Sequence, residues 1–226
     1  MGLFTWETEM ITLAMTGASG APYALRLLER LLLAGERVDL VISEAGRELL
    51  RQECGLDLGE ESGAGVVARL GDFFTRHAGD APPLTGLRHF GVRDWQAPLA
   101  SGSSGARAMV VCPCSMGTLA AIAHGLSDNL LERAADVALK ERWPLILVTR
   151  ETPLSVIHLE NMLAATRAGA VILPASPGFY HRPERIDQLL DFIVDRILMR
   201  LGVPIDAPSH GWPIHPADGR DQGNKV

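Results

Sequence analysis

Apolar runs of strand length alternate with segments of helical periodicity along most of the chain. Short apolar runs flanked by turn residues indicate strands, and apolar positions repeating every three to four residues indicate helices. These patterns predict strands at 10–15, 37–43, 108–113, 144–149 and 170–174, and helices at 22–34, 44–53, 115–124, 129–141, 154–169 and 183–202. We therefore predict an α/β fold with a doubly wound parallel sheet, whose ligand crevice lies beyond the carboxyl ends of the strands.

The stretch 54–100 is less regular than the rest, because Gly and Pro interrupt it. Within it, residues 71–78 have a helical pattern and residues 87–91 have the pattern of a short strand. We expect a single domain over 10–203, preceded by an N-terminal extension at 1–9. Residues 204–226 are rich in Pro, Gly, His and Asp, and we expect them to form an arm or a disordered tail.

Composition favours one globular core and excludes several classes of partner. With 226 residues, 47% of them hydrophobic, the chain is long enough to bury one sizeable core. A net charge of -6 and scattered Lys and Arg residues provide no basic surface for a nucleic-acid backbone. The first ten residues lack a basic leader pattern, and Glu29 and Arg30 interrupt the most apolar helix. We expect a cytoplasmic protein with neither a nucleic-acid nor a membrane partner.

The chain has three cysteines, Cys54, Cys112 and Cys114. An odd number in a chain with a large apolar core favours reduced thiols over disulfides. The Cys-Pro-Cys pair has no second Cys or His pair near it in the sequence, which is too few ligands for zinc. We expect these residues to be buried at a strand end, and we expect no metal site.

The turn after the first predicted strand, at 16–22, consists of small residues. It contains Gly17 and Gly20 but lacks the G-x-G-x-x-G spacing that lets a backbone approach a pyrophosphate. The second strand ends at Ser43, where an acid would be needed to bind a ribose diol. A dinucleotide is therefore disfavoured, and the small hydroxyls suit a mononucleotide phosphate or a flavin better. An ordinary helix N-cap at Ser19 and an ordinary tight turn at Gly17 are an equal alternative.

Two further strand ends carry polar groups at the same predicted edge of the sheet. The strand at 108–113 leads into a small-residue turn and a helix with hydroxyls at Ser115 and Thr118, which repeats the first arrangement. The next strand ends at Arg150 and Glu151. Charges after a strand are commonly just solvated, but a position at the ligand edge favours a functional role. We infer that the two small-residue turns share one ligand.

Four segments resemble the UbiX-type flavin prenyltransferases: MTGASGA, SGSSGARAMVVCPCSMGTLAAIAHGLSDNLLERAADVALKER, RETPLSVIHLENML and AGAVILPASPGFYHRPERIDQLLDFIVDRIL. The resemblance covers most of 11–203 and is weakest over 54–90. It implies a flavodoxin-like Rossmann variant that assembles as a dodecamer and needs no metal. It also implies a reaction that joins the dimethylallyl group of dimethylallyl phosphate to N5 and C6 of reduced FMN. The product, prenylated FMN, serves UbiD-type decarboxylases, and the family is connected with ubiquinone biosynthesis.

The resemblance also implies roles for individual residues. FMN would contact Gly17, Ala18, Ser19, Ser43, Ser115, Met116, Gly117, Thr118 and Arg150. The prenyl phosphate would contact Tyr180, Arg196, Arg133 and Lys140, with Trp95 lining the prenyl pocket. The catalytic groups would be Ser19 beside flavin N5, the acids Glu53 and Glu151, and Lys140. Two positions depart from the family pattern, Met116 from a common Thr and Trp143 from a more usual Arg.

The residues alone leave several of these roles open. Arg133 and Lys140 are seven apart on one predicted helix, so they share a face that is either a phosphate clamp or a solvated charged stripe. Arg196 lies mid-helix near the apolar side and needs an anion, which a carboxylate would satisfy as well as a phosphate. His124 and His158 fall within helical patterns, and we expect them to be structural.

Two other functions compete with the transferase. A flavin-dependent decarboxylase of the phosphopantothenoylcysteine type shares the fold, but its Pro and Met-Asn substrate motif is absent and RETPLSVIHLENML stands in its place. A non-enzymatic FMN carrier would leave Arg133, Lys140, Tyr180 and Arg196 without a joint purpose. In the transferase, loss of phosphate from an allylic carbon requires cations on one side and aromatic faces on the other, and these residues provide both. Ring closure also removes the flavin C6 proton, either to Glu151 or to the released phosphate.

Overall fold

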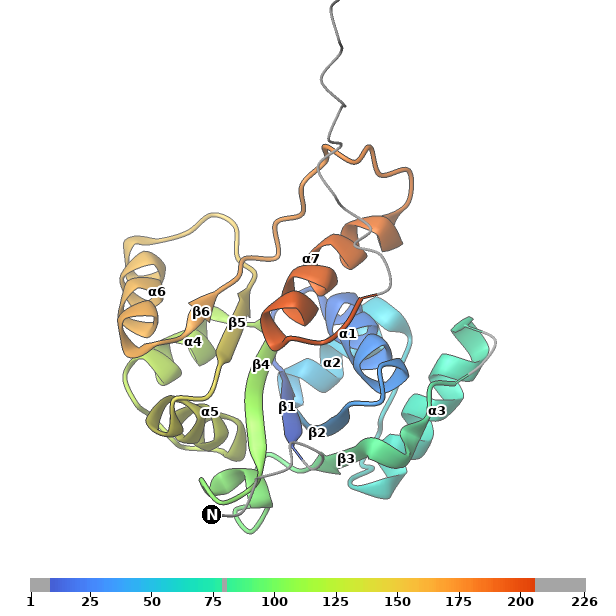
Figure 1. Ribbon diagram of the computed structural model, residues 1–226, viewed down its shortest axis with the longest axis horizontal. Helices are drawn as coiled ribbons and strands as arrows, with labels where there is room; N and C mark the ends of the chain where they lie inside the picture. The colour runs from blue at the N-terminus through green and yellow to red at the C-terminus, as the bar shows by residue number, and fades with distance from the viewer. Residues whose placement is uncertain (1–8, 79–80, 206–226) are drawn as a thin grey trace, which may run out of the picture.

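The structure, a computed structural model, describes residues 9–78 and 81–205. Its centre is one six-stranded parallel sheet with the order β3-β2-β1-β4-β5-β6 (Figure 1). The strands are β1 (Met10–Met15), β2 (Arg37–Ile42), β3 (Leu87–Phe90), β4 (Ala106–Cys114), β5 (Leu145–Thr149) and β6 (Val171–Ile172). The strand order reverses between β1 and β4, so the ligand crevice of a doubly wound sheet is expected beyond the carboxyl ends of these two strands.

Helices cover both faces of the sheet (Figure 1). One face carries α1 (Ala21–Leu33), α2 (Glu44–Cys54), α3 (Ala64–Ala78) and α7 (Ile186–Leu201). The other face carries α4 (Met116–Ala123), α5 (Leu130–Glu141) and α6 (Val156–Ala168). Strand side chains alternate between the two cores: Ile11 and Leu13 face the first, whereas Ala14 faces the second. Burial on both faces explains why the strands appear in the sequence as continuous apolar runs.

The two elements expected in the irregular stretch are present. The helix expected at 71–78 is longer than predicted and begins at Ala64, because Val66 and Leu70 extend its apolar face into the core. The strand expected at 87–91 is β3, which pairs in parallel with β2 at one edge of the sheet. The part of the chain with the weakest sequence pattern therefore completes the sheet and one helical layer.

The strand at the opposite edge of the sheet is shorter than predicted. Residues 170–174 were expected to form it, but β6 covers only two of them. The chain nevertheless continues alongside β5, since the N–H groups of Leu173 and Ala175 donate to β5 carbonyls at 2.9 Å. The difference is therefore one of length at an edge, and the predicted order of strands and helices is confirmed.

The two ends of the chain lie mostly outside the described residues. This applies to the extension expected at 1–9 and to the tail expected at 204–226. Over 9–78 and 81–205, no helix combines the length and the apolar character that crossing a membrane requires.

The carboxyl edge of the sheet is where several helices begin. α1, α2 and α4 start within a few residues of the ends of β1, β2 and β4. The first N–H groups of a helix have no partner within the helix, and they carry the positive end of its dipole. Three such helix starts therefore converge near the central crossover of the sheet.

Candidate functional site

Three loops meet at the carboxyl edge, and Thr16 joins two of them. Its hydroxyl donates to the carbonyl of Pro113 at 2.7 Å and accepts from the N–H of Ser115 at 2.8 Å. Thr16 is buried, and its own N–H donates to the same Pro113 carbonyl. The turn after β1 is thereby fixed to the turn after β4, as a shared ligand requires. Sequence reasoning did not single out Thr16, although a hydroxyl directly after a central strand was a usable signal.

The turn after β1 depends on glycine at two positions. A Cβ added to Gly17 would lie 2.5 Å from the Cβ of Ala45 in α2, so no other residue fits without displacing that helix. Gly20 has a φ of 126° and is the N-cap of α1. The alternative in which Ser19 caps the helix is therefore wrong, and the Ser19 side chain lies exposed at the edge of the sheet.

Glu53 takes the place of a capping side chain for α1. Its carboxylate oxygen Oε2 accepts from the N–H groups of Gly20 and Ala21, each at 2.9 Å. The carboxylate satisfies two helix donors that have no partner within the helix, and it meets the positive end of the helix dipole. This contact holds Glu53, near the end of α2, beside the turn that carries Ser19.

The turn after β4 begins α4 with a side-chain cap. The hydroxyl of Ser115 accepts from the N–H of Thr118 at 3.2 Å and lies 3.0 Å from the Thr118 hydroxyl. Met116 points into the core and is 8% exposed, so the backbone, not this side chain, is available at the edge. A Cβ added to Gly117 would meet no described atom within 4 Å. The replacement of the family's common Thr by Met116 therefore changes core packing and not a side chain that faces the ligand edge.

Ser43 brings β2 to the same edge. It is the N-cap of α2, and its hydroxyl accepts from the N–H of Gly46 at 3.0 Å. Ser43 and Thr118 line one cavity of about 320 Å³, together with Arg93 and Asn129 among other residues. Two of the candidate FMN-binding residues, one directly after β2 and one in the first turn of α4, therefore border the same space.

Arg150 connects the third loop to the first. Its Nε donates to the carbonyl of Ser19 at 2.9 Å, which brings the end of β5 to the turn after β1. Glu151 is exposed, and its Oε1 accepts from the N–H of Thr152 at 2.9 Å. The charged pair after β5 therefore lies at the ligand edge, with the arginine directed at the first turn.

The groups at this edge fit a flavin mononucleotide. The open space beside Gly117 lets a ligand approach the backbone at the start of α4. The hydroxyl of Thr149, at the end of β5, is buried and has no hydrogen-bond partner among the described residues. Small hydroxyls, helix N–H groups and the guanidinium of Arg150 are the donors that a phosphate and the carbonyl groups of a flavin ring accept.

Tyr180 and Arg196 are brought together by a residue that sequence reasoning missed, Phe192 on α7. The Tyr180 ring packs edge-on against Phe192 with centroids 5.6 Å apart, and His181 stacks on Phe192 at 5.7 Å. The Arg196 guanidinium lies 5.8 Å from the centroid of the Phe192 ring. Arg196 is exposed, in contrast to the expectation that it lies near the apolar side of its helix. The signal for Phe192 was its spacing of four residues from Arg196.

Arg133 and Lys140 lie on α5, on the opposite face of the sheet from α7 (Figure 1). Arg133 donates to the carbonyl of Ala100 at 3.1 Å and pairs with Asp136 at 2.6 Å. Lys140 pairs with Glu141 in the last turn of α5, which leads to the amino end of β5. Within one chain, the structure does not bring these two cations to Tyr180 and Arg196.

Trp95 is half exposed, in the loop that follows β3. It comes two residues after Arg93, which lines the cavity shared by Ser43 and Thr118. A large apolar side chain with this exposure is available to a ligand or to another protein surface.

The two candidate structural histidines both have structural contacts. The ring Nε2 of His124 lies 3.1 Å from the Oδ1 of Asn161, which joins α4 to α6. His158 and Ser155 form a capping box at the start of α6. Both contacts are of the kind expected for structural histidines.

The cysteines are free thiols. Cys112 and Cys114 are fully buried at the end of β4, and burial raises the pKa of the Cys114 thiol to about 12. Burial, with a contribution from Glu53, raises the pKa of Cys54 to about 11. Across the described residues, no group of three or more His, Cys, Asp and Glu side chains is arranged to hold a metal ion.

Comparisons with known proteins identify the family. The Flavoprotein family model matches residues 5–198. The flavin prenyltransferase UbiX of Pseudomonas aeruginosa is 54% identical over 198 residues, which cover 88% of this chain and 91% of the relative. The chain belongs to the UbiX flavin prenyltransferase family. The resemblance seen in the sequence motifs is therefore confirmed.

Solved structures of UbiX-type proteins have the same fold. AnUbiX (PadA1), in complex with FMN and dimethylallyl pyrophosphate, gives a TM-score of 0.70 at 41% identity, covering 84% of this chain and 90% of that chain. A dodecameric FMN-dependent UbiX-like decarboxylase from Escherichia coli O157:H7 gives a TM-score of 0.71 at 39% identity, covering 85% of this chain and 94% of that chain. The expected flavodoxin-like α/β fold of this UbiX-family chain is confirmed.

Proposed function

We propose that this UbiX-family chain transfers the dimethylallyl group of dimethylallyl phosphate to N5 and C6 of reduced FMN. The carbon–oxygen bond to phosphate breaks as the prenyl carbon bonds to N5, which loses its proton. The prenyl double bond then takes up a proton, and the resulting tertiary carbon bonds to C6, which loses its proton as the fourth ring of prenylated FMN closes. One observation carries this proposal: hydrogen bonds of Thr16 and Arg150 join three loops at one edge of the sheet. The membership of the chain in this family supports it. We further propose a UbiD-type decarboxylase as the recipient of the product.

The flavin is proposed to lie across the three loops. The positions assigned to it are Gly17, Ala18, Ser19, Ser43, Ser115, Met116, Gly117, Thr118 and Arg150. The bond from Arg150 to the Ser19 carbonyl supports this assignment, because it places a cation and a hydroxyl together at the start of α1. Glu53, near the end of α2, bonds to the turn after β1, and Glu151 lies on the loop after β5, so both carboxylates are near the region where a proton must be moved.

The donor is proposed to bind at Tyr180, Phe192 and Arg196. A guanidinium and a phenol hydroxyl are suitable partners for a phosphate that gains charge as it leaves. The aromatic rings of Tyr180 and Phe192 suit the prenyl group, since ring faces stabilise the cationic character that develops on the allylic carbon. Glu151 and the released phosphate are both available to accept the C6 proton.

A complete donor site is proposed to need neighbouring copies of the chain. Arg133 lies on the face of the sheet opposite to Arg196, and Lys140 lines a cavity with Arg200 in the last turn of α7 and not with Tyr180, so a second copy would have to supply both cations to the donor site. The surface of α6 supports self-association, because it exposes Ile157 and Leu159 by 67% and 52% while it buries the polar Asn161. We propose a homo-oligomer, a dodecamer as in the UbiX-like relative, with Trp95 at the shared site.

The test is mass analysis of the flavin after anaerobic incubation of the purified protein with reduced FMN and a donor. Dimethylallyl phosphate and dimethylallyl pyrophosphate are compared in separate reactions. A flavin that gains one five-carbon prenyl unit is the expected result, with the monophosphate reacting faster. Unchanged flavin with both donors would contradict the transferase and would support the FMN carrier. Release of carbon dioxide from a phosphopantothenoylcysteine-type substrate, without flavin prenylation, would support the decarboxylase.

A further inference from the structure

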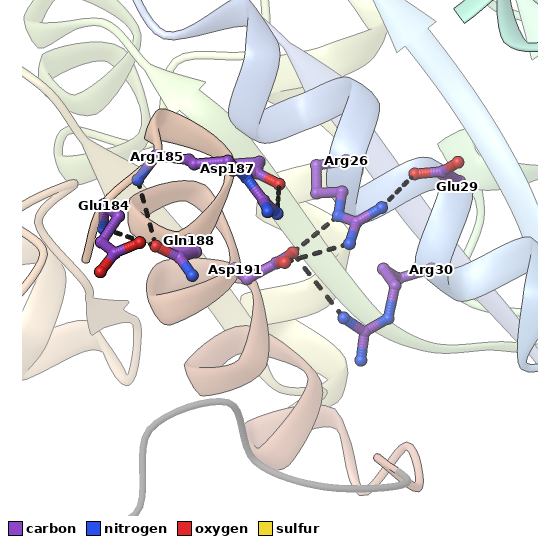
Figure 2. Close-up of polar contacts among 8 residues, drawn as sticks. All are labelled: Arg26, Glu29, Arg30, Glu184, Arg185, Asp187, Gln188 and Asp191. Atoms are coloured by element: carbon purple, nitrogen blue, oxygen red, sulfur yellow. Dashed lines mark hydrogen bonds and ion pairs between the residues drawn. The ribbon is translucent and has the colours of Figure 1, made fainter. Parts of the chain in front are cut away.

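Two arginines of α1 and two aspartates of α7 form a set of ion pairs between these helices, here called the α1–α7 ladder: Arg26, Arg30, Asp191 and Asp195. Arg26 donates through Nε and Nη2 to both carboxylate oxygens of Asp191, at 2.6 and 3.0 Å (Figure 2). Arg30 lies 3.7 Å from Asp191 and 3.4 Å from Asp195. Glu29 accepts from Arg26 at 2.7 Å, so the guanidinium is held from two sides.

The ladder differs from an ordinary surface ion pair in its burial and geometry. The side chain of Asp191 is 16% exposed and that of Asp195 is 4% exposed. Two parallel hydrogen bonds to one carboxylate fix orientation as well as distance, and partial burial strengthens both. The pair between Arg185 and Asp187, at the start of the same helix, is 69% and 49% exposed (Figure 2). Such an exposed ion pair contributes little to the stability of the fold.

Each helix of the ladder carries a different part of the proposed site. α1 begins at Gly20 and Ala21, in the turn that receives Arg150 and Glu53. On α7, Phe192 follows Asp191 and Arg196 follows Asp195 directly in the sequence. Successive residues of a helix point about 100° apart, so the direction of the aspartates sets the direction of Phe192 and Arg196. The ladder thus joins the helix that begins at the turn after β1 to the helix that carries Phe192 and Arg196.

Apolar packing alone does not fix the rotation of α7 relative to α1 as closely as the ion pairs do. The core side of α7 is made of aliphatic residues such as Val194 and Ile197, which contact their neighbours without directional bonds. Apolar contacts tolerate small rotations and shifts of a helix, whereas a two-bond contact between a guanidinium and a carboxylate does not. The ladder is the directional element of the contact between α1 and α7.

We propose that Arg26 and Asp191 are positioning residues for the prenyl transfer, because they set the rotation of α7 and hence the place of Arg196 relative to the flavin turn. This inference rests on the proposed function, in which Arg196 binds the donor phosphate. Loss of the ladder should therefore impair donor binding while the flavin loops, held by Thr16 and Arg150, keep their geometry.

The test is Asp191→Asn, which keeps the shape of the side chain and removes its charge. We expect the KM for dimethylallyl phosphate to rise at least fivefold, with kcat changing less than KM and the Kd for FMN changing less than twofold. Arg26→Lys, which keeps the charge and loses the second hydrogen bond, should raise the KM in the same direction.

The matched control is Asp187→Asn, which removes the same charge from the exposed pair on the same helix and should leave all three constants unchanged. Equal KM values for Asp191→Asn and Asp187→Asn would overturn the inference, as would equal losses of FMN and donor binding. Should Asp191→Asn not fold, an unchanged donor KM in Arg26→Lys would overturn it as well.

Arg196→Ala separates this inference from the proposed function. A raised KM in Arg196→Ala with an unchanged KM in Asp191→Asn refutes the positioning role alone, whereas an unchanged KM in Arg196→Ala refutes the donor site itself.

Discussion

Arg150 and Ser19, which lie on different loops, are joined by a hydrogen bond of 2.9 Å from Nε to the backbone carbonyl. The bond uses one donor of the guanidinium, and its outer nitrogens have no hydrogen-bond partner among the described residues, so they can donate to a ligand at the carboxyl edge of the sheet. One side chain therefore both fixes the first turn and provides a positive charge next to it.

Replacing Arg150 should weaken flavin binding. Arg150→Ala removes a charge-assisted hydrogen bond and a cation from the edge, which together correspond to about 1.5–3 kcal/mol, or a roughly tenfold or greater increase in the Kd for FMN. Titration of the apoprotein with FMN measures this. Arg167→Ala, which removes an exposed arginine from the last turn of α6, is the control and should bind FMN normally.

Glu53 is expected to contribute separately to stability and to the reaction. Glu53→Ala leaves the N–H groups of Gly20 and Ala21 without their acceptor, so the free energy of unfolding should fall by about 1–2 kcal/mol in urea titrations. Glu53→Gln keeps an oxygen acceptor and should recover most of that stability. If the carboxylate acts at the reacting centre, Glu53→Gln will still slow a single turnover. An unchanged single-turnover rate in Glu53→Gln would show that Glu53 only caps α1 and does not act in the reaction.

Replacing Gly17 and replacing Gly117 by alanine should have opposite effects on stability. Gly17→Ala would place a Cβ 2.5 Å from Ala45, so we expect a loss of about 1–3 kcal/mol in stability, together with weaker FMN binding. Gly117→Ala meets open space on the protein side, so stability should be unchanged or higher. If the flavin approaches the backbone there, Gly117→Ala will nevertheless weaken FMN binding. Normal FMN affinity in Gly117→Ala would exclude that approach.

His89 is expected to make the protein less stable in acid. Burial, with a smaller effect of the nearby Arg47 charge, lowers the pKa of His89 to about 4, and its Nδ1 accepts from the N–H of Gly63 at 3.1 Å. In the unfolded chain the pKa is about 6.5, so between these two values the unfolded state binds a proton that the folded state does not. The free energy of unfolding should therefore fall as pH falls from about 6.5 to 4, by up to about 1.4 kcal/mol per pH unit. Urea titrations across this range measure it, and His89→Gln should show a shallower slope.

The exposed face of α6 is expected to hold subunits together. Ile157→Asp introduces a charge at a position that is 67% exposed in the single chain, so the chain itself should fold normally. Light scattering should then show smaller assemblies, because a buried charge without a partner is costly at an interface. Leu33→Asp, at an exposed position at the end of α1, is the control and should keep the assembly size. An unchanged assembly in Ile157→Asp would exclude this face as a subunit contact.

The sequence was sufficient for the strands and for most helices, because residues buried on both sides of the sheet form long apolar runs. It also located the three loops of the site, since each follows such a run directly. Other features depend on contacts between distant parts of the chain. The acceptor at the start of α1 is Glu53, 33 residues away, where the local pattern had indicated Ser19. Likewise, no periodicity reveals that Arg133 and Arg196 lie on opposite faces, because this depends on which way each connection crosses the sheet.

The contact between Glu53 and the start of α1 also has an electrostatic consequence for the choice of ligand. A helix start is ordinarily attractive to phosphate, but here its donors are bonded to a carboxylate that belongs to the protein itself. A second anion at the same place would meet like charge and find the two donors already in use. The start of α1 is therefore less suited to a phosphate group than to an uncharged portion of a ligand. If Ser19 lies beside the reacting atoms of the flavin, as proposed, the phosphate groups of the flavin and of the prenyl donor have to bind at other loops.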